Sequence, residues 1–417
     1  MPFKDLRKIN DNVWEIPKTF KQGMLVPARI YASEKIAREM DEGVYNQVTN
    51  VACLPGILKY AYCMPDGHWG YGFPIGGVAA FDKETGVISP GGIGFDINCG
   101  MRLLLTNLTL KDVQPKIKEL VNQLFQRVPA GVGSSGFLKL SHAEFREAIQ
   151  RGAEWAIEQG YGWQEDLSRT EEDGRMKGSD ASKVSDRAIK RGLTQIGTLG
   201  SGNHYLEIQV ADRIFDEEIA RKFGIVEKDQ IVIMFHCGSR GFGHQIGTDY
   251  LQTFLKVMPK YGIKVLDPEL ACAPFQSQEG QDYYRAMCCG INMSFANRQV
   301  ILHRIREVFS KVFGKSAEEL GMHQVYDVAH NTAKIEKHTV DGKEMDVLVH
   351  RKGSTRAFGP GREEVPKIYR DVGQPVIIGG SMETGSYLLV GTKKAEEETF
   401  ASTCHGSGRT MSRTKAK

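Results

Sequence analysis

The sequence has few cysteines, and none lie in the pairs that build small metal-binding or disulfide-rich folds. Its 417 residues include 8 cysteines, and no two of them form a CxxC motif. A disulfide scaffold and a zinc finger are therefore excluded, because both need closely and regularly spaced cysteines. Single thiols that react or bind a metal stay compatible with this pattern.

Long apolar runs are also absent. No uninterrupted apolar stretch approaches about 18 residues, and the opening sequence MPFKDLRK lacks the apolar segment of a signal peptide. We therefore expect a cytoplasmic protein that does not cross a membrane. Charge of one sign is lacking too, because 54 basic and 51 acidic side chains leave a formal charge of +3. Any nucleic-acid surface must be local.

The chain has no internal repeat, low-complexity block or linker rich in proline and serine, which favours one compact unit. Helices and strands are mixed without a βαβ rhythm, so an α+β fold is predicted. A capping box from Ser141 to Glu144 and a turn at Asp341-Gly342 mark two of the expected elements. Periodicity predicts helices over 110–127, 142–159, 243–261 and 278–313, strands over 231–236, 324–330, 375–380 and 387–391, and a hairpin over 337–350.

Several expected strands run directly into a histidine that is followed by small residues. His236 follows an apolar strand in MFHCGSRGFGH, His330 does the same in VYDVAHN, and His204 follows a glycine-rich turn in GTLGSGNHYLEI. A single histidine at a strand end is more often structural. Three of them converge on one site more readily than scattered residues do.

The glycine-rich segment SPGGIGFDINCG adds a carboxylate and a thiol to these imidazoles. Its glycines allow tight turns that bring Asp96 and Cys99 to one place. One carboxylate, one thiolate and three imidazoles are a ligand set for one or two transition metals, and ligand softness favours zinc over manganese. The alternative is structural, with Asp96 capping a turn and Cys99 as a small buried apolar residue.

A second group of residues suits phosphate chemistry. In TCHGSGRTMSR, His405 lies beside two glycines, a serine and Arg409. Main-chain N–H groups and a guanidinium could surround a phosphate there while the imidazole attacks it. The glycine-rich loops 379–386 and 200–204 could close over a nucleotide. The alternative for residues 403–413 is a flexible basic tail.

Three basic clusters could contact a phosphate backbone through Arg191, Arg240 and Arg356. Arg240 is the strongest candidate because it lies four residues after His236, although most such clusters are solvated surface. Asp66 and His68 lie in a further glycine-rich bend, MPDGHWGYGFPIGG. A structural turn and a polar contribution to catalysis are both compatible with that bend.

Together these motifs resemble the RtcB-type RNA ligase family, which joins RNA 3'-phosphate or 2',3'-cyclic phosphate ends to 5'-hydroxyl ends. The matching segments cover essentially the whole chain in the family's order: MPDGHWGYGFPIGG, SPGGIGFDINCG, LGSGNH, GSRGFGHQ, YDVAHN, HRKGSTRAF and TCHGSGR. The resemblance implies one domain over 1–417 with mixed, largely antiparallel sheets flanked by helices. It also implies a GTP- and manganese-dependent ligase for tRNA splicing or RNA repair, with tRNA halves as the expected substrate and an archease-type activator.

The resemblance further implies a site. Cys99 would bridge two Mn²⁺ ions, with Asp96 and His204 completing one ligand set and His236 and His330 the other. Manganese here stands against the softness argument. His405 would be the guanylylated nucleophile, and Arg191, Arg240 and Arg409 are expected to hold RNA phosphates. Guanylate contacts are implied for Asn203, His204, Tyr205, Leu206, Glu207, His330, Asn331, Gly379, Gly380, Ser381, Met382, Ser386, His405, Gly406, Ser407 and Gly408.

The sequence also departs from the family's pattern. The chain ends a few residues after His405, whereas the family usually carries a further C-terminal segment with a lysine that helps to hold guanine. Glu383 stands where glycine is common, and Trp69 where a smaller polar residue is usual. Two alternatives therefore accompany the ligase: a metal-dependent phosphodiesterase that only opens cyclic phosphates, and an RNA-binding protein with impaired guanylylation.

Overall fold

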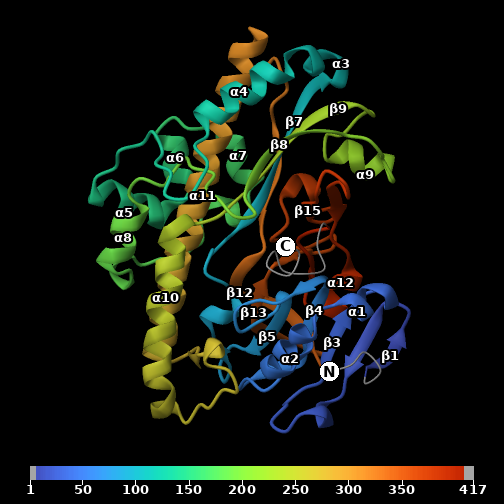
Figure 1. The fold of residues 1–417 in the computed structure, drawn as a ribbon, viewed down its shortest axis with the longest axis vertical. Coiled ribbons are helices and arrows are strands. Elements are labelled where there is room, and N and C mark those ends of the chain that lie inside the picture. The colour runs from blue at the N-terminus through green and yellow to red at the C-terminus, as the bar shows by residue number, and fades with distance from the viewer. Residues whose placement is uncertain (1–5, 408–417) are drawn as a thin grey trace.

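The structure, a computed structural model, describes residues 6–407 and contains two main β-sheets, drawn one above the other in Figure 1. The seven-stranded sheet comprises β1 (Arg7–Asn10), β2 (Val13–Ile16), β3 (Ala28–Tyr31), β4 (Ile57–His68), β5 (Ile75–Asp82), β13 (Lys343–Lys352) and β12 (Asn331–Val340), in that spatial order. The four-stranded sheet comprises β11 (Gln324–Ala329), β7 (Gly100–Thr109), β9 (Gln230–Cys237) and β8 (Tyr205–Val210). Only β3 and β4 pair in parallel within these two sheets. The predicted α+β fold with largely antiparallel sheets is confirmed.

Three small two-stranded sheets accompany the two main sheets. They pair β6 (Val87–Ile88) with β10 (Ala273–Pro274), β14 (Ser354–Arg356) with β17 (Ser402–Cys404), and β15 (Pro375–Ile378) with β16 (Tyr387–Val390).

Most of the helices pack together on one side of the sheets, at the left in Figure 1. This group contains α4 (Ile117–Arg127), α5 (His142–Arg151), α6 (Ala153–Glu158), α7 (Gln164–Ser168), α8 (Asp186–Gly192), α10 (Arg240–Val257) and α11 (Gln278–Phe313). The others are α1 (Glu34–Glu39), α2 (Glu42–Val51), α3 (Leu110–Val113), α9 (Glu217–Lys222) and α12 (Lys393–Thr399). Across residues 6–407, no helix combines the length and apolarity that a membrane span requires.

Local signals explain which helix predictions hold. The helix over 278–313 is confirmed, with Ser277 accepting a hydrogen bond from the Gly280 amide at its start. The Ser141 capping box is also confirmed, but the helix it opens breaks at Gly152, whose φ is +61°. The helix over 110–127 is likewise divided, because Pro115 lacks an N–H and a 3₁₀ turn separates α3 from α4.

The strand predictions are confirmed, and the remaining helix is shifted. The helix expected over 243–261 begins at Arg240, ends at Val257 and continues as a 3₁₀ turn containing Pro259. In the predicted hairpin, Asp341 and Gly342 have φ of +49° and +78° and join β12 to β13. Two consecutive positive φ angles are the requirement of a type I′ turn, which matches the twist of the flanking strands.

His330 is the residue at which the chain passes from one main sheet to the other. It lies between β11, in the four-stranded sheet, and β12, in the seven-stranded sheet. Its amide donates to the Cys99 carbonyl at 2.8 Å, and its carbonyl accepts from the Ser354 amide at 3.1 Å. Main-chain hydrogen bonds on both sides therefore hold His330 in place between the two sheets.

A buried charge network joins α11 to the four-stranded sheet. Asp327 on β11 accepts hydrogen bonds at 2.7 Å from Nε of both Arg102 and Arg298, and all three side chains are fully buried. Asp327→Asn would leave two buried guanidiniums without their anion, so we expect a loss of about 3–5 kcal/mol of unfolding free energy. Equilibrium denaturation of both proteins measures this difference. Glu217→Gln, which removes an exposed pair with Arg221, is the matched control, and an equally small effect of both substitutions would contradict the prediction.

Candidate active site

Strand register brings the histidines and Cys99 to the same end of the four-stranded sheet, where its strands begin or finish. β7 begins directly after Cys99, and its residue Met101 lies opposite His236 on β9. Tyr205, which follows His204, lies opposite His236 from the other side. Ala329, which precedes His330, lies opposite Gly100. Residues distant in sequence therefore meet because they flank paired strand ends.

The five predicted metal ligands form two groups that share Cys99: Asp96 with Cys99 and His204, and Cys99 with His236 and His330. The Cys99 Sγ lies 3.4 Å from His204 Nε2 and 3.0 Å from His236 Nε2. His204 Nε2 lies 2.7 Å from Asp96 Oδ2, and the Nε2 atoms of His236 and His330 are 3.0 Å apart. The contacts thus form one series, from Asp96 through His204, Cys99 and His236 to His330.

The hydrogen bonds of two imidazoles favour metal binding by this group. His204 Nδ1 lies 3.0 Å from the Leu199 carbonyl, and His236 Nδ1 lies 2.9 Å from the Asn203 carbonyl. A carbonyl only accepts, so each Nδ1 carries a proton, and the Nε2 of His236 presents a lone pair to the cluster. The Nε2 of His204 faces the Asp96 carboxylate and would present its lone pair once a metal ion replaces the proton between them. Within residues 6–407, the buried Asp96 Oδ1 also has no hydrogen-bond partner. Converging lone pairs, a carboxylate and a thiol fit one or two divalent metal ions.

The pKa shifts of these groups also favour metal binding. Burial, reinforced by the neighbouring imidazoles, lowers the pKa of His236 and of His330 well below the usual value, so both rings are neutral. Burial and the Asp96 carboxylate raise the pKa of the Cys99 thiol well above its usual value, so a thiolate there needs a cation beside it. Burial alone would raise the pKa of Asp96, but its pairing with His204 lowers it to about 2.

Arg298 braces the turn that carries Cys99 and the end of β9 that carries His236. Its Nη1 donates to the Asn98 carbonyl at 2.7 Å and to the Cys237 carbonyl at 2.8 Å. Both carbonyls belong to residues adjacent to a proposed ligand. The buried network around Asp327 therefore also positions the cluster.

His405 extends the line of contacts beyond His330, and Asp66 fixes its orientation. The two imidazole centroids are 4.7 Å apart. Asp66 Oδ2 lies 2.6 Å from His405 Nδ1 and accepts the main-chain amides of His405 and Gly406, each at 3.0 Å. Because Nδ1 faces the carboxylate, Nε2 is the ring nitrogen left to act as a nucleophile.

A cavity of about 280 Å³ adjoins His405. Seven of the residues predicted to contact guanylate line it: Asn203, Tyr205, Gly379, Gly380, Ser381, His405 and Gly406. Asp66, His68, Met101 and His236 complete its lining. The cavity thus lies between the nucleophile candidate and the metal cluster.

Other predicted nucleotide contacts lie around this cavity without lining it. Ser386 and Ser407 hold its loop, because Ser386 accepts the Gly380 amide at 3.1 Å and the Ser407 amide donates to the Gly379 carbonyl at 2.9 Å. Asn331 braces the metal turn instead, donating to the Asp96 carbonyl at 3.0 Å. His204 and His330 belong to the ligand groups, Leu206 and Glu207 lie on β8, Met382 is fully exposed, and Gly408 lies outside the described residues.

The predicted arginine contacts have different outcomes. Arg240 approaches the cluster, with Nη1 at 3.4 Å from His204 Nδ1, and Arg191 is exposed on α8. Arg409 lies outside the described residues. The interpretation of Arg356 as a phosphate contact is wrong, because its side chain is buried against Glu171 at 3.0 Å and Glu172 at 2.9 Å. A run of basic residues cannot reveal that acidic residues far away in sequence neutralise one of them.

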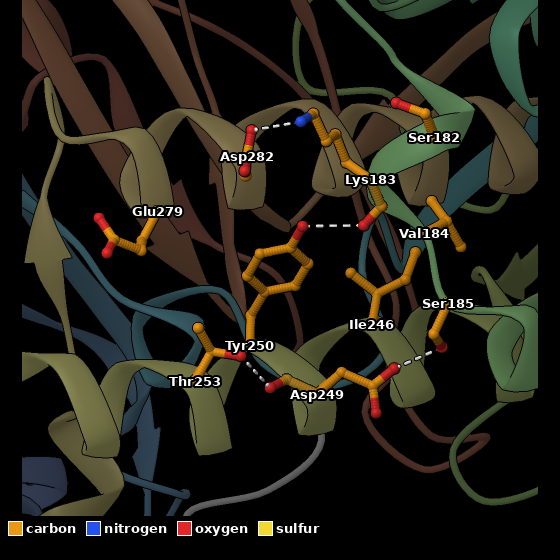
Figure 2. A pocket seen from close by; sticks show the side chains of 10 residues that line it. All are labelled: Ser182, Lys183, Val184, Ser185, Ile246, Asp249, Tyr250, Thr253, Glu279 and Asp282. Atoms are coloured by element: carbon orange, nitrogen blue, oxygen red, sulfur yellow. Dashed lines mark hydrogen bonds and ion pairs between the residues drawn. The ribbon is translucent and has the colours of Figure 1, made fainter.

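A larger cavity, of about 470 Å³, lies between α10, the start of α11 and residues 182–185 (Figure 2). Lys183 pairs with Asp282 there at 3.1 Å, and Ser185 donates to Asp249 at 2.6 Å. None of the predicted site residues lines it. Its acidic lining separates it in character from the cavity beside His405.

Sequence reasoning missed some residues of this region. The contact between Asp66 and His405 spans 339 positions, and the glycine-rich bend around Asp66 gave only a general signal for a polar role. Met101 lies in the ordinary apolar pattern of β7, so no sequence motif identified it as a residue of the cavity. Neither Glu383 nor Trp69 lines the cavity, and the Trp69 indole lies where a Cβ on Gly43 would be.

Comparisons with known proteins identify the family of this chain. The family model described as tRNA-splicing ligase RtcB matches residues 47–417. Proteins named tRNA-splicing ligase RtcB are similar to this chain: that of Archaeoglobus fulgidus is 57% identical over 99% of this chain and 85% of the relative. Those of Methanococcus maripaludis and Thermococcus kodakarensis are 56% and 54% identical, over 98% and 100% of this chain and 85% and 86% of the relatives. With identity of this extent across the whole framework that carries the cluster, the chain belongs to the RtcB family of tRNA-splicing ligases.

Proposed function

We propose that this chain is a GTP- and Mn²⁺-dependent RNA ligase that joins 3'-phosphate or 2',3'-cyclic phosphate ends to 5'-hydroxyl ends through a histidine-GMP intermediate. The observation that carries the proposal is His405, oriented by Asp66, beside a cavity and next to His330 in the line of ligand groups. A nucleotide in that cavity would have its phosphates between the imidazole and the metal cluster. The names of the relatives support RNA as the substrate.

Two Mn²⁺ ions, held by Asp96, Cys99 and His204 and by Cys99, His236 and His330, would offset phosphate charge and orient the line of attack. The protein's own part begins at His405. Its Nε2 attacks the α-phosphorus of GTP, the N–P bond forms, and the P–O bond to pyrophosphate breaks. The Nδ1 proton stays on the imidazole and faces the Asp66 carboxylate, whose negative charge offsets the positive charge that develops on the ring.

The later steps transfer the guanylate to RNA. A cyclic phosphate end is first opened by water to a 3'-phosphate. An oxygen of that phosphate attacks the guanylate phosphorus, and the N–P bond to His405 breaks. The 5'-hydroxyl then attacks the RNA 3'-phosphorus and GMP leaves. Arg191 and Arg240 are assigned to the RNA phosphates in these steps.

Incubation of the full chain with a 3'-phosphate RNA strand, a 5'-hydroxyl strand, GTP and MnCl₂ tests the proposal. We expect a joined strand on a denaturing gel, which omission of GTP or addition of a chelator abolishes. A cyclic phosphate end that is opened without any joined product would overturn the proposal in favour of a phosphodiesterase. A cytoplasmic location, an archease-type activator and tRNA halves as the native substrate stay predictions.

A further inference from the structure

An exposed basic face of α8 begins beside the metal cluster. Arg187, Lys190 and Arg191 are exposed there, and Lys190 and Arg191 follow Arg187 by three and four residues, so both lie on the side of the helix that carries Arg187. The nearby acid Asp186 pairs with Arg146 at 3.2 Å instead. Among residues 6–407, no carboxylate forms an ion pair with any of these three cations, and Arg191 bonds to the Gln245 amide oxygen at 2.9 Å. The charges are therefore available to an external anion.

An aromatic pair connects this face to the proposed metal ligands. His244 on α10 stacks on Phe95, with centroids 4.9 Å apart and planes at 30°. Phe95 directly precedes Asp96, and His244 is exposed. Gly247 lets the phenyl ring lie against α10, because a Cβ there would come within 3.0 Å of Phe95 Cδ1.

The same pair presents a neutral aromatic surface beside a cation. Partial burial against Phe95, together with the guanidinium of Arg191, lowers the pKa of His244 and favours the uncharged ring. Aromatic rings on which bases stack, next to cations that bind phosphates, are the combination that recognises single-stranded nucleic acid.

The order of contacts within the site indicates which RNA strand meets this surface. Phe95 and Arg240 lie at the Asp96 end of the line of ligands, and His405 lies at the other end, beyond His330. The nucleotide binds on the His405 side, where GMP must also leave. In-line displacement at phosphorus places the attacking oxygen opposite the leaving group. The Asp96 end of the series is the end away from His405, so we assign the approach of the 5'-hydroxyl to that end.

We propose that the RNA strand carrying the 5'-hydroxyl crosses the Phe95–His244 pair, which stacks one of its bases, and continues along α8, where Arg187, Lys190 and Arg191 bind its phosphates. This path rests on the proposed function and adds to it the direction of one substrate strand. Arg187 and Arg191 are separated by about 6 Å along the helix axis, so they bind different phosphates. Beyond Ser185, which caps α8, the cavity of Figure 2 is lined by Asp249, Glu279 and Asp282, so the basic face of α8 does not continue there. Asp282 pairs with Lys183 and Glu279 with Lys260.

Binding of a 3'-labelled, single-stranded 5'-hydroxyl RNA, measured by fluorescence anisotropy over a range of KCl concentrations, tests the path. Each phosphate that R187A/K190A no longer neutralises should weaken RNA binding at 0.1 M salt about fivefold. Each such phosphate should also make the slope of log K against log[KCl] shallower by about 0.7. For His244→Ala we expect weaker binding with an unchanged salt slope, because stacking releases no counterions. K111A/K118A removes two exposed cations near α4, far from α8 in Figure 1, and should bind RNA as the unaltered chain does.

Labelling with GTP in the absence of RNA separates this proposal from the proposed function. That reaction needs His405 and not the RNA path, so R187A/K190A should be labelled at the rate of the unaltered chain, which also shows that it folds. Unchanged RNA affinity in R187A/K190A, or an equal loss in K111A/K118A, would overturn the path while leaving the ligase proposal intact. Absent labelling of the unaltered chain would instead count against the ligase, whatever the RNA affinities.

Discussion

Replacing His405 with alanine is expected to abolish covalent labelling of the protein by GTP. The Nε2 lone pair of this ring adjoins the cavity, and an alanine at the same position offers no nucleophile. The measurement is incubation with α-labelled GTP and MnCl₂, followed by denaturing electrophoresis. The label on the unaltered chain should be lost in mild acid, because an N–P bond to imidazole is acid-labile.

Two variants make this result specific to His405. His323→Ala removes a half-exposed imidazole that pairs with Glu165 far from the cavity, and it should be labelled normally. Asp66→Asn keeps the nucleophile but loses the anion that holds its Nδ1 proton, so we expect labelling to slow by about 100-fold or more without disappearing. Persistent acid-labile label in His405→Ala would show that another residue is the nucleophile.

The second large effect concerns Cys99. Its sulfur belongs to both ligand groups, so Cys99→Ser should weaken the binding of both ions, by at least about 100-fold in affinity. A serine hydroxyl stays neutral and cannot bridge two cations as a thiolate does. Titration calorimetry with MnCl₂, combined with metal analysis after dialysis, measures affinity and stoichiometry.

Cys53→Ser is the matched control, because that thiol is half-buried and donates to the Thr49 carbonyl at 3.3 Å, outside both groups. It should bind manganese as the unaltered chain does. Two ions bound by Cys99→Ser with undiminished affinity would contradict the bridging role. A parallel titration with zinc compares the metal that ligand softness favours with the metal that the family resemblance implies.

Local physical chemistry predicted much of the fold. The Ser277 and Ser141 caps, the Asp341-Gly342 turn and the apolar strands act over a few residues, and the structure confirms them. The errors arose where the apolar pattern of a helix continued past a residue at which the helix is interrupted: Pro115, which lacks an N–H, and Gly152, which adopts a positive φ. Periodicity records which side chains are apolar and does not record where the helix hydrogen bonds stop.

The sequence indicated which residues form the candidate site better than it indicated which of them contact one another. Motifs that follow strands identified the residues of the cluster, because paired strand ends gather such residues. The pairing of Asp66 with His405, and the burial of Arg102 and Arg298, depend on packing between distant segments. Arginine is ordinarily a surface residue, so sequence patterns give no reason to place two of them beside one aspartate in the core.

The position of His330 between the two main sheets has a thermodynamic consequence. One of its neighbours in sequence is fixed in one sheet and the other in the second, so a rotation between the sheets displaces its Nε2 from Cys99 and His236. If the cluster holds cations as proposed, their binding and the mutual orientation of the sheets are reciprocally coupled: each stabilises the other by the same free energy. Anything that twists the two halves of the framework apart, including a partner bound far from the cluster, would lower its affinity for the ions.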